Sequence, residues 1–558
     1  MSGSGRTVRR RHALTLALAG LLTAVLLLPT AGAVAAPQKA KSTQAAKAKG
    51  AAAKANANGR SATAPPAKAC DKRNNNTYQK VLGCVTLEGV REHQAAFQAI
   101  ADANGGTRAA GTPGYDASVD YVVQTMEAAG WNVELHEFPF TYVPPPTLQQ
   151  LTPVSATYET GIFTGSGTGT VTGNVIPVDI NLVPPRASTS GCEAADFTGL
   201  DFSGPNDIAL VQRGTCDFGV KAQNAQNAGA EAVIIFNQGN DPTRVDLITG
   251  TLLPTGAGVT IPVVGASFAD GSALAQPGST ARIQVDPAES RPQVNVIAEL
   301  PGKNDDNVVM AGAHLDSVQR GPGINDNGSG SAALLEVGQT LSKLKPENTI
   351  RLAWWGAEES GLIGSNQYVG SLSQEELDRI ALYLNFDMIG SPNYIFMVYD
   401  SDESGFTAPV PVPAGSTAIE DLFESFYTLR NEPYDDAEFS GRSDYQAFIL
   451  NGIPSGGLFT GAEVPKTPLQ VTIWGGVAGQ QYDPCYHIAC DTYANNSDHA
   501  LEVNSDSVAF AVLTYAYSTE TVNGVRGKRV PGNFTIPAPA GPEGTVGSGG
   551  GDEHDEES

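Results

Sequence analysis

Short apolar runs alternate with helical patterns from Gln293 onward, and this alternation constrains the fold more than any other feature. Strands are predicted for four runs: Val294–Leu300, Val308–Ala313, Ile350–Trp355 and Tyr383–Met388. Between them, helical spacing of apolar residues covers Ser329–Leu344 and begins again at Ser360. Strands that alternate with helices are typical of a layered α/β sheet, so we expect an α/β fold.

Candidate metal ligands follow these strands. His314 comes directly after the second run, Glu359 shortly after the third, and Asp387 at the end of the fourth. Asp326 lies on a tight loop that opens a helix, and His487 lies between two cysteines. Each residue alone has an ordinary structural explanation, such as a helix cap or a solvated carboxylate. Because active-site groups gather at the carboxyl ends of strands in such sheets, their joint placement favours a metal centre.

Two histidines and three carboxylates suit a pair of divalent cations, and zinc is the metal that such ligands favour. Two neighbouring cations need a bridging carboxylate to reduce their repulsion. Asp326 is the predicted bridge, because its loop lies between the other strand ends. The sequence therefore predicts a two-zinc hydrolase.

Three neighbours of these ligands are the candidate catalytic residues. Asp316 is expected to accept the second imidazole N–H of His314 and to fix its tautomer. Glu358 is expected to act as the general base that takes a proton from the attacking water. Tyr486 is expected to donate a hydrogen bond to the oxyanion that forms on the scissile carbonyl.

The chain divides by composition into segments of different character. The segments are a signal peptide (1–35), a disordered linker or pro-segment (36–69), the first part of the α/β domain (70–143), a β-rich inserted unit (144–290), the main part of the α/β domain (291–525) and a Pro/Gly-rich acidic tail (526–558). The β-rich unit contains one predicted helix, Phe218–Ala230, followed by a buried strand, Ala232–Phe236.

The N-terminus has the pattern of an export signal. Arginines precede an apolar run from Ala13 to Leu28, and Ala33-Val34-Ala35 supplies small residues for cleavage. An uncleaved anchor is the alternative. We expect a secreted, extracellular protein without a membrane-spanning segment.

Six cysteines in an exported chain can all pair. Proximity favours Cys70–Cys84, Cys192–Cys216 and Cys485–Cys490, while other pairings, free thiols and a thiolate metal site stay open. The net charge of −25 disfavours nucleic acids and anionic membranes as partners. The expected partners are peptide substrates, and we expect a monomer.

Several strings of the α/β part are highly specific: AGAHLDSV, GINDNGSGSAALLE, RLAWWGAEESGLIGS, YLNFDMIGSPN, GRSDYQAF, GGLFTGA and YHIACDT. They closely resemble the secreted bacterial leucine aminopeptidases of the aminopeptidase S type, in family twenty-eight of the metallopeptidases. The resemblance covers about residues 86–140 and 290–525. It implies the zinc exopeptidase fold, an α/β/α sandwich with a mixed central sheet, and two zinc ions.

The resemblance also implies which residues hold each ion. By position, His314, Asp326 and Asp387 would hold one zinc, and Asp326, Glu359 and His487 the other.

Further residues match by position. Glu358 matches the general base of the family, and Tyr486 matches its oxyanion-binding tyrosine. Arg442, which helps to hold the substrate end in that type, is kept, but Tyr445 stands where relatives have histidine. The Asp326–Asn327 bond is expected to be cis, as in relatives. Relatives can also bind a structural calcium near the C-terminal helix, where Glu502 and Asp506 fall, so calcium stays open as a further cofactor.

The inserted unit carries a second resemblance. The string ALVQRGTCDFGVKAQNAQNAGAEAVIIFN is similar to a protease-associated domain, a β-rich insertion found in many larger exopeptidases of this family. Such a domain could cover the site or select substrates by size, or act only as structural filler.

Substrate preference depends on few residues. Phe459, Met388 and Ile389 predict an apolar pocket for the first side chain of a peptide, with ordinary core packing as the equal alternative. The resemblance implies an aminopeptidase with a leucine-like preference. A carboxypeptidase of the same family and a non-catalytic binding protein of this fold are the competing functions.

Overall fold

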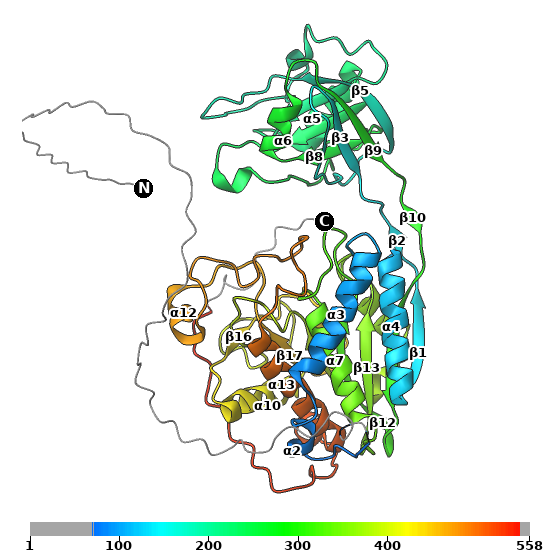
Figure 1. The fold of residues 1–558 in the computed structure, drawn as a ribbon, viewed down its shortest axis with the longest axis vertical. Helices are drawn as coiled ribbons and strands as arrows, with labels where there is room; N and C mark the ends of the chain where they lie inside the picture. The colour runs from blue at the N-terminus through cyan, green and yellow to red at the C-terminus, as the bar shows by residue number, and fades with distance from the viewer. Residues whose placement is uncertain (1–69, 71, 547–558) are drawn as a thin grey trace, which may run out of the picture. The chain divides into compact units, whose positions relative to one another are not determined.

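The computed structural model describes residue 70 and residues 72–546 (Figure 1). The predicted signal peptide (1–35), the predicted linker or pro-segment (36–69) and the end of the predicted tail lie outside these residues. Among the described residues, no helix has both the length and the apolar content needed to cross a membrane.

The main domain is built on an eight-stranded mixed sheet in the order β1-β11-β13-β12-β14-β17-β15-β16. Its strands are β1 (Asn132–Phe138), β11 (Gln293–Leu300), β12 (Asn304–His314), β13 (Asn348–Trp355), β14 (Ile380–Phe386), β15 (Met397–Tyr399), β16 (Asp435–Ala437) and β17 (Ser455–Phe459). The central strands β13, β12, β14 and β17 run parallel to one another. Strands β1, β11 and β15 pair antiparallel with their inner neighbours, which gives the sheet its mixed character.

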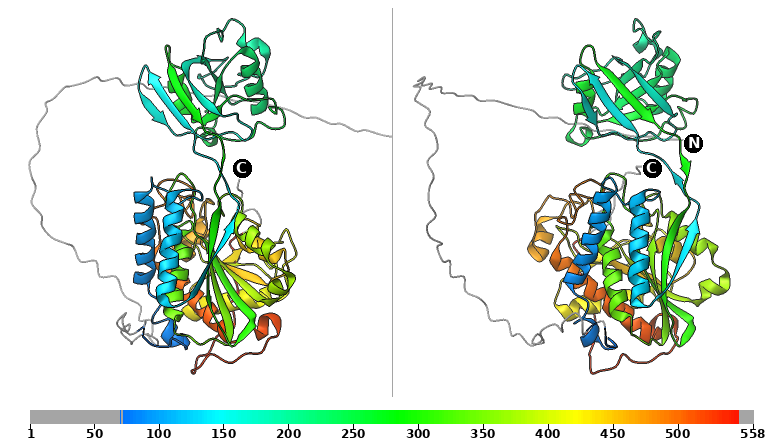
Figure 2. Two further views of the ribbon diagram at one scale, coloured as in Figure 1. Left: turned by 90° about the vertical axis from the view of Figure 1, so that its right-hand side faces the viewer. Right: turned by 45° about the vertical axis from the view of Figure 1, so that its right-hand side comes forward.

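Helices cover both faces of this sheet, so the predicted α/β/α sandwich is confirmed. One face carries α2 (Tyr78–Val81), α3 (Leu87–Ala103), α4 (Pro113–Ala129), α7 (Gly328–Leu341), α10 (Ser416–Arg430), α13 (Asp498–Tyr517) and α14 (Glu520–Asn523). The other face carries α8 (Ile363–Ser371), α9 (Gln374–Arg379) and α11 (Tyr445–Ile449). The short helix α12 (Pro468–Trp474) follows β17 in the chain. Figure 1 and both views of Figure 2 show α3, α4 and α7 side by side on the first face.

Alternation of side chains along the strands produces two cores. In β13, Leu352 and Trp354 pack into the core beneath α3, α4, α7 and α13, whereas Ala353 and Trp355 pack into the core beneath α8 and α11. This period of two is the expected consequence of strand geometry. Both faces are apolar because both are covered.

Local signals set the helix ends. Thr112 accepts a hydrogen bond from Tyr115 N at the start of α4, Pro113 occupies its first turn, and Gly130 ends it with a left-handed φ of 93°. The helix expected from Ser360 begins later, at Ile363, because Gly361 and Leu362 both adopt positive φ angles (95° and 57°).

The region between β1 and β11 forms a separate seven-stranded sheet in the order β4-β3-β9-β5-β6-β7-β8. Its elements are β3 (Thr147–Thr152), β4 (Ala156–Tyr158), β5 (Gly169–Pro177), η1 (Ala194–Phe197), β6 (Ile208–Gln212), α5 (Phe218–Ala228), β7 (Ala232–Phe236), η2 (Pro242–Arg244), β8 (Val263–Ala266), α6 (Phe268–Leu274) and β9 (Thr280–Val285). Helices α5 and α6 pack on opposite faces, each over its own apolar cluster.

A two-stranded ladder lies where the chain enters and leaves this unit. Strand β2 (Thr141–Tyr142) pairs antiparallel with β10 (Glu289–Ser290). The seven-stranded unit thus lies in the chain between strands that pair with each other, which is consistent with the predicted β-rich insertion. The limits of that insertion at residues 144 and 290 stay a prediction.

The three favoured disulfides, Cys70–Cys84, Cys192–Cys216 and Cys485–Cys490, are all present. The predicted acidic tail is only partly described. Residues 526–546 form no helix or strand, yet Val530 is buried in the main core and the Phe534 ring lies 4.7 Å from that of Tyr78.

Candidate metal centre and catalytic pocket

The predicted ligands meet at the carboxyl edge of the parallel strands. His314 is the last residue of β12, Glu359 follows β13, and Asp387 follows β14. Because these three strands are neighbours and parallel, their ends deliver the three side chains to one place.

Asp326 comes from the loop between β12 and α7. The Asp326–Asn327 peptide bond is cis, as expected. Asn327 accepts a hydrogen bond from Gly330 N and so caps α7. The Asp491 carboxylate accepts hydrogen bonds from the backbone N–H groups of Asn325 (2.8 Å) and Asp326 (3.0 Å). These contacts fix the loop from both sides.

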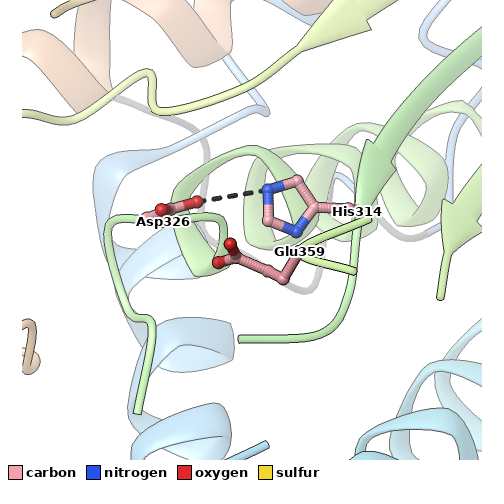
Figure 3. Close-up of side chains that lie close together, drawn as sticks. All are labelled: His314, Asp326 and Glu359. Atoms are coloured by element: carbon pink, nitrogen blue, oxygen red, sulfur yellow. Dashed lines mark ion pairs between the residues drawn. The ribbon is translucent and has the colours of Figure 1, made fainter. Parts of the chain in front are cut away.

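The two oxygens of Asp326 face two different histidines. Its Oδ1 lies 3.2 Å from His314 Nε2, and its Oδ2 lies 3.2 Å from His487 Nε2. Asp387 Oδ1 lies 3.3 Å from His314 Nε2, and Glu359 Oε2 lies 2.9 Å from His487 Nε2. Figure 3 shows the Asp326 and Glu359 carboxylates beside the His314 imidazole. All five predicted ligands therefore lie together, in two groups that Asp326 joins.

His487 reaches this centre from the loop closed by the Cys485–Cys490 disulfide. Its backbone is left-handed, with φ 58°. Ala357 and Met388, which precede Glu358 and follow Asp387, are also left-handed, with φ 55° and 49°. Non-glycine residues rarely adopt this conformation, and such strain is concentrated at functional sites.

The donor set fits metal cations. Asp326 Oδ2, Glu359 Oε1 and Asp387 Oδ1 are buried and accept no hydrogen bond from any described residue. Burial alone would lower the pKa of His487, yet Glu359 and Asp326 raise that pKa to about 11. The centre thus carries an excess of negative charge that cations would neutralise.

Asp316 differs in detail from the expectation. His314 Nδ1 lies 3.1 Å from the backbone carbonyl oxygen of Asp316 and 3.7 Å from its carboxylate. The carboxylate Oδ1 instead accepts a hydrogen bond from Glu358 N at 3.2 Å. The backbone carbonyl is therefore the nearer acceptor for the imidazole, and the carboxylate holds the backbone of Glu358.

Glu358 points into the same centre as the ligands. Its Oε2 lies 3.9 Å from His314 Nε2, and its side chain lines the pocket. Burial raises the pKa of Glu358 well above 4.5, and the charge of Asp387 raises it further, while His314 opposes both effects. A carboxyl group with a raised pKa suits reversible proton transfer near neutral pH.

Tyr486 and Arg442 also line the pocket. The Tyr486 ring stacks on the His487 imidazole, with centroids 3.7 Å apart. Burial raises the pKa of Tyr486 well above 10, so the phenol keeps its proton and remains a donor. Arg442 Nη1 lies 3.7 Å from Glu463 Oε1.

The pocket beside the metal ligands has a volume of about 380 Å³. Met388 and Phe459 both line it, whereas Ile389 belongs to the main core. Tyr445, which stands where relatives have histidine, also lines the pocket. Further lining residues that the sequence did not single out are Met397, Tyr399, Asp436, Tyr482 and Val546. Most of these side chains are aromatic or apolar, so one side of the centre suits an apolar group.

Other residues that support the site were also missed. Ser443 donates a hydrogen bond to Asp387 Oδ2 at 2.6 Å and accepts one from Asn385 Nδ2. The fully buried Arg108 donates to the carbonyl oxygens of Leu315, Pro322 and Gly323, in the loop that joins His314 to Asp326. Ser443 lies within the conspicuous GRSDY string, but nothing in the sequence links Arg108 to that loop.

The residues considered for calcium lie on α13. Asp506 forms an ion pair with Arg430, and neither Glu502 nor Asp506 belongs to a described cluster of potential metal ligands.

Two family models match the chain. The model described as "Peptidase family M28" matches residues 295–512, and the model described as "PA domain" matches residues 171–274. The first match contains all five candidate ligands and Glu358. The second falls within the separate seven-stranded sheet.

Named relatives and solved structures agree with these matches. An aminopeptidase of Pseudomonas aeruginosa is 47% identical over 449 residues, which cover 79% of this chain and 83% of the relative. A probable leucine aminopeptidase 2 of Aspergillus fumigatus is 45% identical over 356 residues, or 62% of this chain and 68% of the relative. The structure of BSAP, a zinc aminopeptidase from Bacillus subtilis, aligns with a TM-score of 0.55 and 27% identity, over 76% of this chain and 94% of that one.

Proposed function

The chain belongs to peptidase family M28, and on that basis we propose that it is a secreted zinc aminopeptidase that uses two zinc ions. One observation carries the two-ion proposal: the two oxygens of Asp326 face His314 and His487 separately. A single ion would leave one histidine and one of the carboxylates Asp387 and Glu359 without a metal partner. His314, Asp326 and Asp387 would hold one ion, and Asp326, Glu359 and His487 the other.

The residues around the ligands support a hydrolytic mechanism. Zinc, when bound, acidifies water and polarises a carbonyl group. Glu358 takes a proton from the attacking water and delivers it to the leaving amine, because its carboxyl group lies beside the ligands and lines the pocket. Tyr486 keeps its phenolic proton and donates a hydrogen bond to the oxyanion. Asp316 holds the Glu358 backbone through its carboxylate.

Substrate binding is assigned to the remaining pocket residues. Met388 and Phe459 form part of an apolar wall that would receive the first side chain, which supports a leucine-like preference. The negative charges of Glu358 and Asp387 would attract the free N-terminal amine, and Arg442 would hold the peptide beyond the scissile bond. The Aspergillus relative named as a leucine aminopeptidase agrees with this preference.

Secretion is supported by the three disulfides and by the N-terminal pattern of the sequence. We expect a monomer in solution, which light scattering would check.

A panel of aminoacyl-anilides, assayed with and without a chelator, tests the proposal. Leucyl-anilide should be hydrolysed faster than the lysyl and glutamyl compounds. A chelator should abolish the activity, and added zinc should restore it. An enzyme that is indifferent to metal removal would contradict the zinc mechanism.

A further inference from the structure

A second group of buried carboxylates lies apart from the proposed zinc ligands, although one of them, Asp436, also lines the catalytic pocket. Asp400 follows β15, Asp436 lies in β16, and Glu420 and Glu424 project from α10. Their side chains are 2%, 4%, 3% and 8% exposed, respectively. One oxygen each from Glu420, Glu424 and Asp436 lies within 4.8 Å of the others, and the same holds for Asp400, Asp402 and Glu420. Glu420 belongs to both groups and joins them.

The loop that bears Asp400 converges on the same point. Asp400 accepts hydrogen bonds from Ser404, Gly405 and Phe406 N–H groups, and Ser404 Oγ lies 3.3 Å from Asp436 Oδ2. A Cβ at Gly405 would lie 2.8 Å from Asp436 Oδ2 and 3.5 Å from Asp400 Oδ2. The two carboxylates are thus directed to one side of the loop.

One carboxylate oxygen of this group has no partner. Asp436 Oδ1 is buried and accepts no hydrogen bond from any described residue. A buried carboxylate oxygen without a donor is costly unless a cation approaches it.

Among the described residues, no Lys, Arg or His forms an ion pair with these four carboxylates. Burial raises the pKa of Glu420 to about 9 and the pKa values of Glu424 and Asp436 to about 7. The charged neighbours that raise them further are all carboxylates, and no basic side chain is among them. A bound cation would therefore favour ionisation of the whole group near neutral pH.

The chemistry of the donors selects the cation. All of them are oxygens, and Asp400-Ser401-Asp402-Glu403-Ser404-Gly405 has the D-x-D-x-S-G spacing that begins a calcium-binding loop. Glu420, from a helix elsewhere in the chain, would take the place of the loop's later glutamate. Carboxylate and hydroxyl oxygens on a loop suit Ca²⁺ rather than Zn²⁺, which prefers nitrogen and sulfur.

We propose that Asp400, Asp402, Glu420, Glu424 and Asp436 form a calcium site distinct from the zinc centre. Bound calcium would join β15, β16 and α10. Met397, Tyr399 and Ala437 of these strands line the catalytic pocket, so the site would brace one pocket wall.

Calcium titration of the full-length, zinc-loaded protein tests this proposal. The protein is first equilibrated in calcium-free buffer, and its zinc content is verified by elemental analysis. Calorimetric titration with CaCl₂ should show saturable binding, and the unfolding temperature should rise with calcium concentration. The same concentration of MgCl₂ should raise it less, because Mg²⁺ demands stricter geometry.

Three variants locate the binding. Glu420→Gln and Asp436→Asn should each weaken calcium affinity by at least about tenfold, because each removes a charged ligand. In calcium-free buffer both should melt at or above the wild-type temperature, since each relieves repulsion, and this result also shows that they fold. The control Glu502→Gln, at the other position considered for calcium, should bind calcium as the wild type does. Absent calcium binding, unchanged affinity in both cluster variants, or loss of binding in Glu502→Gln would overturn the proposal.

Discussion

At the scale of single residues, adjacent glutamates have different surroundings. Glu359 contacts His487 at 2.9 Å, whereas Glu358 lies 3.9 Å from His314 and its backbone N–H is held by Asp316. The left-handed conformation of Ala357 lies directly before this pair. One position can therefore bind metal while the next remains available for proton transfer.

Replacing Glu358 separates these two roles. Glu358→Gln removes the proton acceptor but none of the proposed ligands, so kcat should fall about 10²–10⁴-fold with zinc content unchanged. Elemental analysis and steady-state kinetics on the same preparation check both quantities. The control Glu375→Gln changes an exposed glutamate and should leave kcat unchanged. Loss of zinc from Glu358→Gln would show instead that Glu358 is a ligand.

At the scale of elements, three of the five ligand positions were predictable because each lies at the end of a strand that apolar patterning indicates. His314, Glu359 and Asp387 could be placed at one edge without any structure. The apolar wall could not, because Met397 and Tyr399 lie on a three-residue strand whose neighbours are set by long-range packing. Arg108 was missed for the same reason, since its carbonyl partners are more than two hundred residues away in the chain.

The first turn of α7 packs closely against the backbone at the end of β14. A Cβ at Gly330 would lie 2.2 Å from Phe386 O, directly before Asp387, and 2.6 Å from Asn327 Oδ1. Gly330→Ala should therefore reduce the free energy of unfolding by about 1–3 kcal/mol and weaken zinc binding. Denaturant unfolding and zinc titration would measure these effects.

Gly370→Ala is the matched control for that change. Gly370 is also helical, but a Cβ there would meet nothing within 4 Å. This variant should be neutral or slightly more stable, because alanine favours helix. Equal behaviour of the two variants would contradict the steric explanation.

The packing of α3 on α4 and α7 predicts a pH dependence. His93 is buried in α3, with Nδ1 2.7 Å from Tyr121 Oη and Nε2 3.2 Å from Gln339 Oε1. Burial lowers its pKa from 6.5 to about 4, although the Gln339 contact opposes the change. The unfolded chain therefore takes up this proton first, so stability present above pH 6.5 is lost as the pH falls towards 4.

The expected loss from His93 is about 2 kcal/mol between pH 8 and pH 5. Relative to His93→Gln, the wild type should lose this amount of unfolding free energy when the pH is lowered from 8 to 5. A pH-independent difference for His93→Gln would contradict the buried neutral state of His93.

At the scale of the whole molecule, the apolar clusters fall into two sets that share no residues. The apolar clusters of the seven-stranded sheet contain only residues from Leu148 to Val285, and the main clusters contain none of these. Metal binding stabilises only the part that holds the metal. Calorimetry should therefore show two unfolding transitions, of which zinc removal lowers one and zinc addition restores it. An equal shift of both transitions would show that the two parts unfold as one unit.

Zinc-dependent cleavage at the N-terminus can be tested with one peptide in three forms. Its free form, an N-acetylated form and a C-terminally amidated form are incubated with the zinc-loaded enzyme, and products are identified by mass spectrometry. An aminopeptidase should remove the first residue from the free and amidated peptides and leave the acetylated peptide intact. Cleavage of the acetylated peptide, with protection of the amidated one, would instead identify a carboxypeptidase and rule out an aminopeptidase.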